Sequence, residues 1–458
     1  MQLSRPDPEP PVEGSKDPRA GALRARLSAA ACVLLAAGAP ARARADGAAS
    51  NQFEATALAY GERRRTDVVE PTARVTRLFA NGQSLSLQLG IDAITGASPT
   101  GALPAGRQLG TVQTTTTPSG QVQTTAPPAP SAIPLAQFRD IRGAFDAEWS
   151  APVGVLTPTL GGHFSRERDF QSAGGSGKLS VDLLQRTTTL TVGGGFEYDD
   201  VFPTVFGPGG GSNEGGEGEA RVQPAVGWVD ATVPDSARNF IKRVGTGMVG
   251  ISQVLTRRWI VGVDLSRSLE RGYLTEPYKI VSVMQPDSGY TLGAYKERRP
   301  TTRDRRAVLA STVYHFARDV LHLSYRWYQD DWRVRSSTVD LAYRHDLPKV
   351  GDGVWVEPHL RAYQQTGAYF YTPGFVQGAP LPAYATADQR LAPFSSGTAG
   401  LTIGFKLPTA PGEWTVRAEY IGQIGHEHPA GLVGVQRGYD QFPRLDVGSL
   451  VVGYSVSF

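Results

Sequence analysis

The sequence predicts an all-β fold, a transmembrane antiparallel β-barrel of about 16 strands, on the basis of three observations. The closing segment from Leu450 to Phe458 alternates large apolar side chains with small or polar ones. Short alternating runs recur along the chain, and the connections between them are alternately short and long. Outside residues 27–37, no apolar segment approaches the ~20 residues that a spanning helix needs. A count of 14 strands would also fit, and a soluble β-sandwich is the alternative fold.

The N-terminal region predicts an exported protein. Arg24 and Arg26 precede the apolar run 27–37, and small-residue cleavage sites follow it at residues 41–45, as in a secretory signal peptide. We therefore expect residues 1–45 to be a signal peptide with a polar N-terminal extension, and residues 46–458 to form one barrel domain. Cys32, the only cysteine, lies in the segment to be removed, so no disulfide is expected. Without this segment the formal charge is balanced, which argues against a nucleic-acid partner.

The tight connections and the long ones predict the two ends of the barrel, because such barrels have short turns in the periplasm and long loops outside. Tight turns are expected at residues 80–83, 150–152, 185–186, 256–258, 318–319, 348–353 and 408–412. The first of them contains Asn81-Gly82, a strong hairpin signal. Long loops are expected at residues 95–135, 201–239, 272–302, 370–393 and 427–445. Two of these loops carry low-complexity stretches, one rich in Thr and one rich in Gly.

Individual strands predict which face meets lipid. In the segment from Val320 to Tyr328, apolar Leu321, Leu323 and Trp327 alternate with polar or charged residues. A charge at the bilayer midplane costs roughly 2 to 4 kcal/mol, so the charged set should face inward. The predicted lumen-lining residues are Arg142, Asp146, Glu148, Asp264, Arg326, Asp340, Arg344, Glu357, His359, Arg361, Arg417 and Glu419.

These lumen residues include both signs of charge, which leaves two interpretations open. In the first, adjacent strands let Arg326 or Arg344 pair with Asp340 or Glu357, and the polar interior satisfies itself. In the second, the charges form a selectivity filter. We favour the self-paired interior.

Several segments resemble the bacterial family known as domain of unknown function 3570. They are residues 92–99, 165–170, 271–279, 297–300, 325–332 and 388–391, which occur in the family's order. The resemblance implies an exported outer-membrane barrel without an established role. The Thr-rich insert after Thr100 and the Gly-rich insert after Phe206 depart from the family pattern.

The resembling segments lie mostly where strands pass into long loops. The loop-mouth candidates are Glu167, Arg168, Asp169, Tyr273, Tyr278, Arg298, Arg299, Arg303, Asp330, Asp331, Asp388 and Arg390. The arginine-rich stretch of Arg298, Arg299, Arg303, Arg305 and Arg306 can bind anionic lipopolysaccharide or an anionic solute through bidentate contacts. They can equally pair with the acidic residues of neighbouring loops, which is the interpretation we favour.

The sequence shows no recognisable catalytic or cofactor motif. The histidines lack catalytic spacing with Ser or Asp, and a GxSxG elbow is absent. His426 and His428 would need a third ligand to hold a metal. Asp199-Asp200 and Asp330-Asp331 lack the spacing of a dedicated calcium loop. We therefore expect no enzyme activity, no cofactor and no metal.

The sequence favours a pore or channel for small solutes, with the loop 272–302 as an internal constriction. A non-conducting surface scaffold that presents its loops is the alternative, and a hydrolase that depends on His359 or His322 is a third. We expect the protein to lie in the bacterial outer membrane, in contact with lipid and lipopolysaccharide. The alternating end of the chain, with Tyr454, Val456 and Phe458, resembles the signal read by the barrel-assembly machinery.

Overall fold

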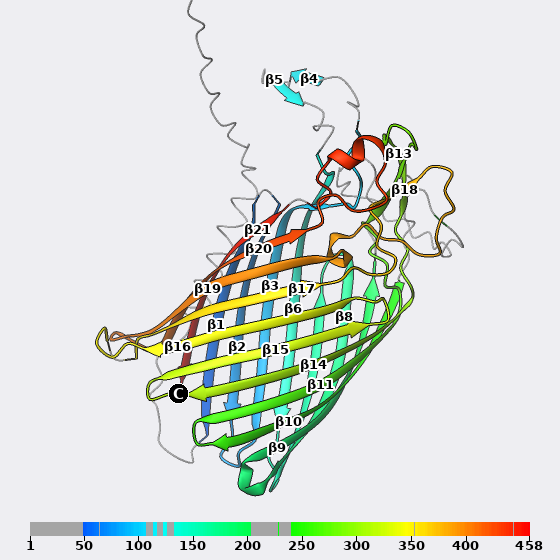
Figure 1. The fold of residues 1–458 in the computed structure, drawn as a ribbon. Helices are drawn as coiled ribbons and strands as arrows, with labels where there is room; N and C mark the ends of the chain where they lie inside the picture. Colours follow the sequence, from blue (N-terminus) through cyan, green and yellow to red (C-terminus); the bar gives the residue numbers. More distant parts are fainter. Residues whose placement is uncertain are drawn as a thin grey trace, which may run out of the picture.

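The computed structural model describes residues 49–63, 65–106, 113–116, 122–125, 132–202, 228, 240–351, 353–442 and 444–458. Within them, 16 antiparallel strands form one closed barrel, as Figure 1 shows, which confirms the predicted fold and strand count. The predicted signal peptide, residues 1–45, and the Gly-rich insert after Phe206 lie outside the described residues. None of the helices in the described part of the chain is long and apolar enough to cross a membrane.

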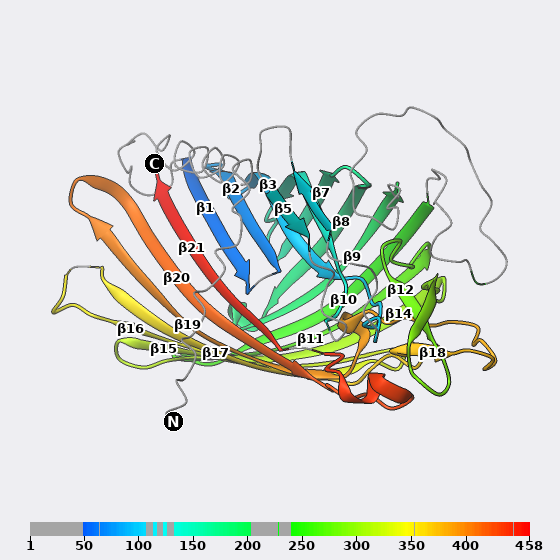
Figure 2. The same cartoon turned by 90° about the horizontal axis from the view of Figure 1, so that it is seen from above.

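The barrel strands follow one another around the wall in chain order, each hydrogen-bonded to the next. They are β1 (Ser50–Glu62), β2 (Thr66–Leu78), β3 (Ser84–Pro99), β6 (Leu135–Ser150), β7 (Leu156–Arg166), β8 (Phe170–Leu183), β9 (Thr188–Val201), β10 (Phe240–Thr256), β11 (Trp259–Gly272), β14 (Thr302–His315), β15 (Asp319–Asp330), β16 (Arg335–Asp346), β17 (Trp355–Gln365), β19 (Phe394–Leu407), β20 (Ala410–Gly425) and β21 (Leu445–Ser457). Figure 2 shows β15 to β17 on the wall opposite β1 to β3.

The first and last strands close the barrel. β21 pairs with β1 in a register that sets Tyr454 opposite Ala55 and Val456 opposite Phe53. Asn51 and Phe458 exchange backbone hydrogen bonds of 2.7 and 2.8 Å. Closure gives every strand of the barrel a hydrogen-bonded neighbour on both sides, which is what a barrel in lipid requires.

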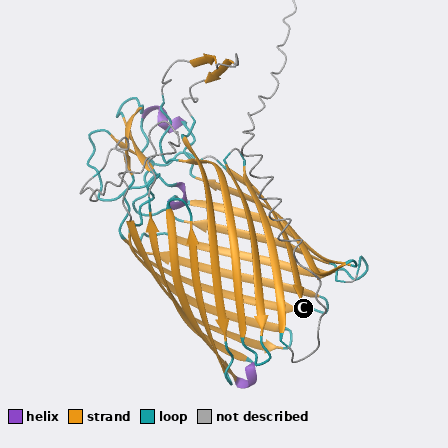
Figure 3. Ribbon diagram, turned by 180° about the vertical axis from the view of Figure 1, so that it is seen from behind, coloured by secondary structure: helices purple, strands orange, loops and turns teal. Residues whose placement is uncertain are grey.

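The connections divide the barrel into two ends, which we call the turn end and the loop end. The seven predicted tight turns lie at the turn end, and the strand ends that flank the five predicted long loops lie at the other, as Figure 3 shows. Of the loop 201–239, only residues 201, 202 and 228 are among the described residues. At the first turn, Gly82 adopts φ +81°, and the Asn81 side chain accepts a hydrogen bond from the Gln83 backbone at 3.1 Å. The Asn-Gly signal therefore acts through local turn geometry.

Side chains alternate between an outward apolar face and an inward polar face on most of each strand. On β3, Leu87, Leu89 and Ile91 are exposed on the outside, whereas Ser86 and Gln88 line an interior cavity. The register transmits this alternation from strand to strand, because directly opposed residues share a face. On β20, Trp414, Val416 and Tyr420 accordingly pair with outward residues of β21.

The long loops fold together into what we call the loop cap. It contains a three-stranded sheet of β12 (Ile280–Met284), β13 (Thr291–Lys296) and β18 (Gly374–Val376), with short helical turns at η2 (Gln389–Leu391) and η3 (Gly434–Gly438). Three buried clusters hold it, centred on Trp332, Val281 and Met284. In Figures 1 and 3 the sheet of the cap stands beyond the strand ends. That loop 272–302 narrows the lumen stays a prediction.

The remaining elements lie outside the barrel wall and the cap. At the turn end, η1 (Leu184–Arg186) connects β8 to β9, with Leu184, Gln185 and Arg186 all at positive φ. At the loop end, the Thr-rich insert contains a two-stranded sheet of β4 (Gln113–Thr116) and β5 (Val122–Thr125).

Candidate functional site: the lumen and the loop end

One wall of the lumen carries a network of paired charges. Asp340 on β16 accepts a hydrogen bond from Arg361 on β17 at 2.6 Å. His359 lies between two carboxylates, 3.1 Å from Asp340 and 2.9 Å from Glu419. The contact with Glu419 passes over Gly400 of the intervening strand, where a Cβ atom would lie 2.7 Å from the Glu419 side chain. A glycine on β19 is thus what lets side chains two strands apart meet.

The pairings that the sequence suggested for Arg326 and Arg344 are wrong. Arg344 stacks over the Trp355 ring at 4.0 Å and reaches Asp346, not Asp340 or Glu357. Arg326 forms no ion pair within the described part of the chain and lies over the Tyr328 ring. Asp340 lies directly opposite Arg361 on the neighbouring strand. Its carboxylate therefore binds Arg361 and His359 instead of Arg326 or Arg344.

The opposite wall is lined by small residues. On β7 to β10 the inward positions include Gly161, Gly174, Gly193 and Gly195. Their missing side chains leave two neighbouring cavities of about 510 and 450 Å³ along the lumen. Cavities of this volume are typical of sites that bind small molecules.

Unequal charges line the two cavities. The larger one is lined by Asp146, Glu148 and Glu197 and by one arginine, Arg74, with His163 hydrogen-bonded to Asp146 at 2.6 Å. The smaller one is lined by Lys178, Arg305 and Arg326 at inward positions and by Glu148, and it is bordered by Arg267 and Arg306, which occupy outward positions of β11 and β14. Arg305 pairs with Glu270 at 2.6 Å, but Lys178 and Arg326 make no ion pair with any described residue. The lumen thus holds charge that is available to a polar solute.

The register places the remaining predicted lumen residues on the inward face as well. Arg142 pairs with Asp92 at 2.5 Å, and Arg417 donates to the Thr402 hydroxyl at 3.2 Å. Asp264 leans over Gly250, where a Cβ atom would lie 2.2 Å from its carboxylate. Glu357 shares its face with Thr402 of β19 and makes no ion pair with described residues.

Arginines of the predicted loop mouth mostly pair with acidic residues, as favoured. Arg303 donates twice to Asp330, at 2.9 and 2.6 Å, and stacks over Trp332. Asp331 accepts from the backbone of Asp304 at 3.0 Å. Arg298 lies over the Tyr384 ring and Tyr273 stacks on Phe240. These contacts tie the loops to the rim.

A buried ion network lies inside the cap. Arg299 contacts Glu297 at 2.6 Å and Asp388 at 2.8 Å, and Arg390 bridges Asp388 and Glu276. Burial disfavours the Asp388 carboxylate, but Arg390 and Arg299 outweigh it and lower the pKa of Asp388. Burial lowers the pKa of the Lys279 amine in the same cap. The network joins the loop after β11 to the loop after β17.

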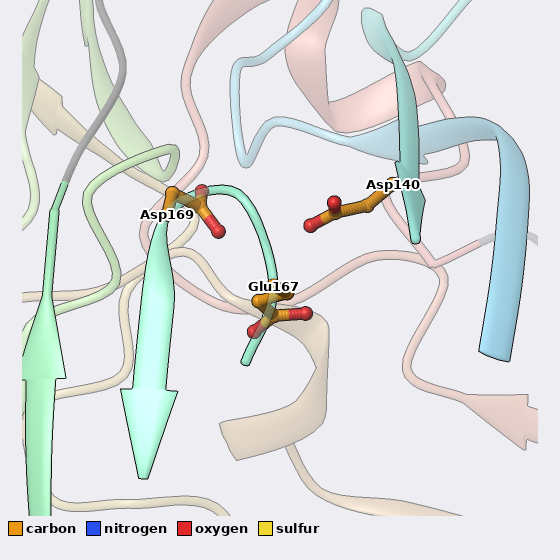
Figure 4. Close-up of side chains that lie close together, drawn as sticks. All are labelled: Asp140, Glu167 and Asp169. Carbon is orange, nitrogen blue, oxygen red and sulfur yellow. The ribbon is translucent and has the colours of Figure 1, made fainter. Parts of the chain in front are cut away.

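Glu167 and Asp169 do not pair with the loop arginines, contrary to expectation. With Asp140 of β6 they form a group of carboxylates whose oxygens lie within 4.8 Å of one another, shown in Figure 4. Burial, followed by repulsion from Asp140 and Asp169, raises the pKa of Glu167 to about 7. Burial also raises the pKa of Asp169, which accepts a hydrogen bond from Tyr278. Arg168, in the same loop, makes no ion pair with described residues.

This acidic group is a feature that the sequence analysis missed. Carboxylate oxygens are the ligands that calcium and magnesium prefer, so the group is able to hold such a cation. The histidines considered for a metal are not part of it, and His428 contacts the backbone of Tyr439 instead.

The family model described as "Protein of unknown function (DUF3570)" matches residues 24–456. No curated protein matches the chain. Solved structures with a similar shape include OccK5 (OpdH) of Pseudomonas aeruginosa, at TM-score 0.37 and 8% identity, with 90% of this chain and 98% of that chain covered.

Two further solved structures give similar values. OpdO of Pseudomonas aeruginosa has a TM-score of 0.40 at 9% identity, with coverage of 90% of this chain and 97% of that chain. CdiB from Acinetobacter baumannii has a TM-score of 0.44 at 8% identity, with coverage of 88% and 60%. All three TM-scores lie below 0.5, so these similarities carry no functional conclusion.

Proposed function

This chain belongs to the DUF3570 family, whose function is unknown, and we propose that it forms a water-filled pore for small polar solutes in the bacterial outer membrane. The observation that carries the proposal is the combination of a closed 16-stranded barrel with a polar lumen that contains cavities of about 510 and 450 Å³. A barrel of this strand number is wide enough for an aqueous path.

The outward face supports a place in a membrane. Large apolar side chains such as Leu89, Leu160 and Val249 are exposed there, with no protein to cover them. Outward aromatic residues, including Trp149, Trp259 and Tyr314, gather near the turn end. Apolar bands bordered by aromatic residues are typical of outer-membrane barrels, and the turn end would then face the periplasm.

The lumen supports passage of polar solutes in preference to catalysis. His359 is held by Asp340 and Glu419, and among the hydrogen bonds of the described residues none joins a histidine to a serine side chain. We therefore propose no enzyme activity, and we propose that the unpaired Lys178 and Arg326 contact solutes in transit.

Cysteine modification tests the pore directly. The sole cysteine, Cys32, lies in the predicted signal peptide, so a new cysteine would be the only thiol of the mature protein. Ser176 faces the lumen between the two cavities, whereas its neighbour Gly177 belongs to the outward face with Leu160. A bulky cationic thiol reagent should reduce the conductance of Ser176→Cys in a planar bilayer and leave Gly177→Cys unchanged. Equal responses of the two variants would contradict a lumenal path.

A second candidate is a non-conducting scaffold that presents its loops to a partner. The observation that favours it is the loop cap, whose buried clusters give the loops a fixed shape. Correctly folded protein that conducts no current in planar bilayers, with or without its cap, would favour this scaffold over the pore.

A further inference from the structure

The outer wall near the loop end carries four exposed arginines that the pore does not use. Arg243 of β10 lies directly opposite Arg271 of β11, and Arg267 of β11 lies directly opposite Arg306 of β14. On each strand these arginines alternate with residues that point inward. On β11, Arg267 and Arg271 lie on the same face as the exposed residues Leu265 and Leu269. All four therefore point away from the lumen.

Such an arrangement is unfavourable without a counter-ion. Like charges directly opposite each other across a ladder repel, and here two such pairs lie on three consecutive strands. Asp304 neutralises part of one pair, since it binds Arg267 at 3.0 and 2.9 Å and Arg306 at 2.9 Å. Arg243 and Arg271 have no ion pair with any described residue, and the Arg243 guanidinium lies over the Tyr198 ring. Arg267 and Arg306 remain 58% and 60% exposed.

The height of the patch fits the lipid headgroups. Trp259 marks the turn-end border of β11, and at ~3.3 Å per residue and ~40° tilt Arg267 lies roughly 20 Å above it. The apolar band of such barrels is about 25 Å tall, so Arg267 is near its upper border and Arg271 lies beyond. Outward-facing Trp327 lies opposite Val308, two residues from Arg306 toward the turn end. An aromatic residue is expected at that border of the apolar band.

We propose that Arg243, Arg267, Arg271 and Arg306 bind the phosphate groups of lipopolysaccharide in the outer leaflet. Guanidinium groups bind phosphate through paired hydrogen bonds, and a lipid that carries two phosphates matches two arginine pairs on one wall. The inference rests on the proposed membrane location. Of the arginines expected to contact lipopolysaccharide, the inference keeps Arg306, whereas Arg299, Arg303 and Arg305 pair with acidic residues.

The test compares binding of purified lipopolysaccharide by refolded wild type and by the variant with all four arginines changed to Gln. Each arginine near an anionic surface contributes about a fivefold change in affinity, so the fourfold variant should bind several-hundredfold more weakly. Added salt should weaken wild-type binding. Arg318→Gln, a change of an exposed arginine in the turn between β14 and β15 at the turn end, is the control and should bind as wild type does.

Three outcomes would overturn the inference. They are unchanged binding by the fourfold variant, equal loss in Arg318→Gln, and equally strong binding of soluble pyrophosphate that is lost in the fourfold variant, which would indicate that the four arginines form a site for free anions. Heat-modifiable gel mobility checks that each variant is folded. The arginines lie outside the lumen, so unchanged conductance of the variant separates failure of this inference from failure of the pore.

Discussion

At the scale of single residues, Asp340 is the centre of the lumenal charge network. Its carboxylate accepts from Arg361 and contacts His359, so its loss would leave both partners without an acceptor on β16. Unpaired polar groups in a partly buried site are destabilising. Among the described residues, Asp340 is the acidic residue that pairs with Arg361, and no second one does.

We predict that Asp340→Asn lowers the free energy of unfolding by about 1–3 kcal/mol, because charge-assisted hydrogen bonds contribute in that range. Urea unfolding of the refolded barrel measures it. Glu357→Gln is the control, since Glu357 is also inward but makes no described ion pair, and its effect should be close to zero. Equal effects of the two substitutions would show that the network is not what stabilises this wall.

A second residue-scale prediction concerns Glu167, whose pKa is raised to about 7 in the folded protein. An acid with a raised pKa binds its proton more tightly when folded, so its contribution to stability is lost as pH rises from about 4.5 through about 7. We expect Glu167→Gln to raise the unfolding temperature at pH 8 and to leave it nearly unchanged at pH 4. Asp287→Asn, an exposed loop change, should have no effect at either pH.

At the scale of elements, the loop cap and the barrel are held by different forces. The barrel depends on its ladder of backbone hydrogen bonds, whereas the cap depends on buried clusters and on the Arg299, Glu297 and Asp388 network. Removing one partner from a buried ion group leaves an uncompensated charge, which is strongly destabilising. The cap should therefore open without loss of the barrel.

We predict that Asp388→Asn makes residues 273–301 sensitive to protease while the barrel keeps its heat-modifiable mobility. Glu427→Gln, a change in an exposed cap residue without a described side-chain partner, should leave the digestion pattern unchanged. Protease resistance equal to wild type in Asp388→Asn would mean that the three clusters alone hold the cap.

The sequence predicts the elements of this molecule far better than its contacts. Strands and turns follow from local signals, since alternation has a period of two and Asn81-Gly82 specifies its own turn. The sheet of β12, β13 and β18 joins two loops that are far apart in the chain. The sequence of neither loop indicates that it pairs with the other. The group of Asp140, Glu167 and Asp169 likewise depends on strand register, which cannot be read from spacing alone.

At the scale of the whole molecule, the two walls of the lumen have different roles in the proposed pore. The wall with paired charges is fixed by its contacts, and the glycine-lined wall leaves the open volume. The cap stands beyond the strand ends, so a solute would meet it before it enters the lumen.

We predict that replacing residues 279–297 by a short Gly-Ser linker increases conductance or leaves it unchanged, because this segment lies in the cap outside the lumen. Planar-bilayer recordings of folded protein measure it. A fall in conductance would show that the cap holds the pore open and would contradict its role as an outer cover.

The most direct test of the pore is the single-channel conductance of the refolded protein, residues 46–458, in planar bilayers. The polar lumen and its cavities predict steady, discrete current steps, because a continuous aqueous path admits small ions. Absence of current from protein whose heat-modifiable mobility proves that the barrel is folded would contradict the pore and favour the scaffold.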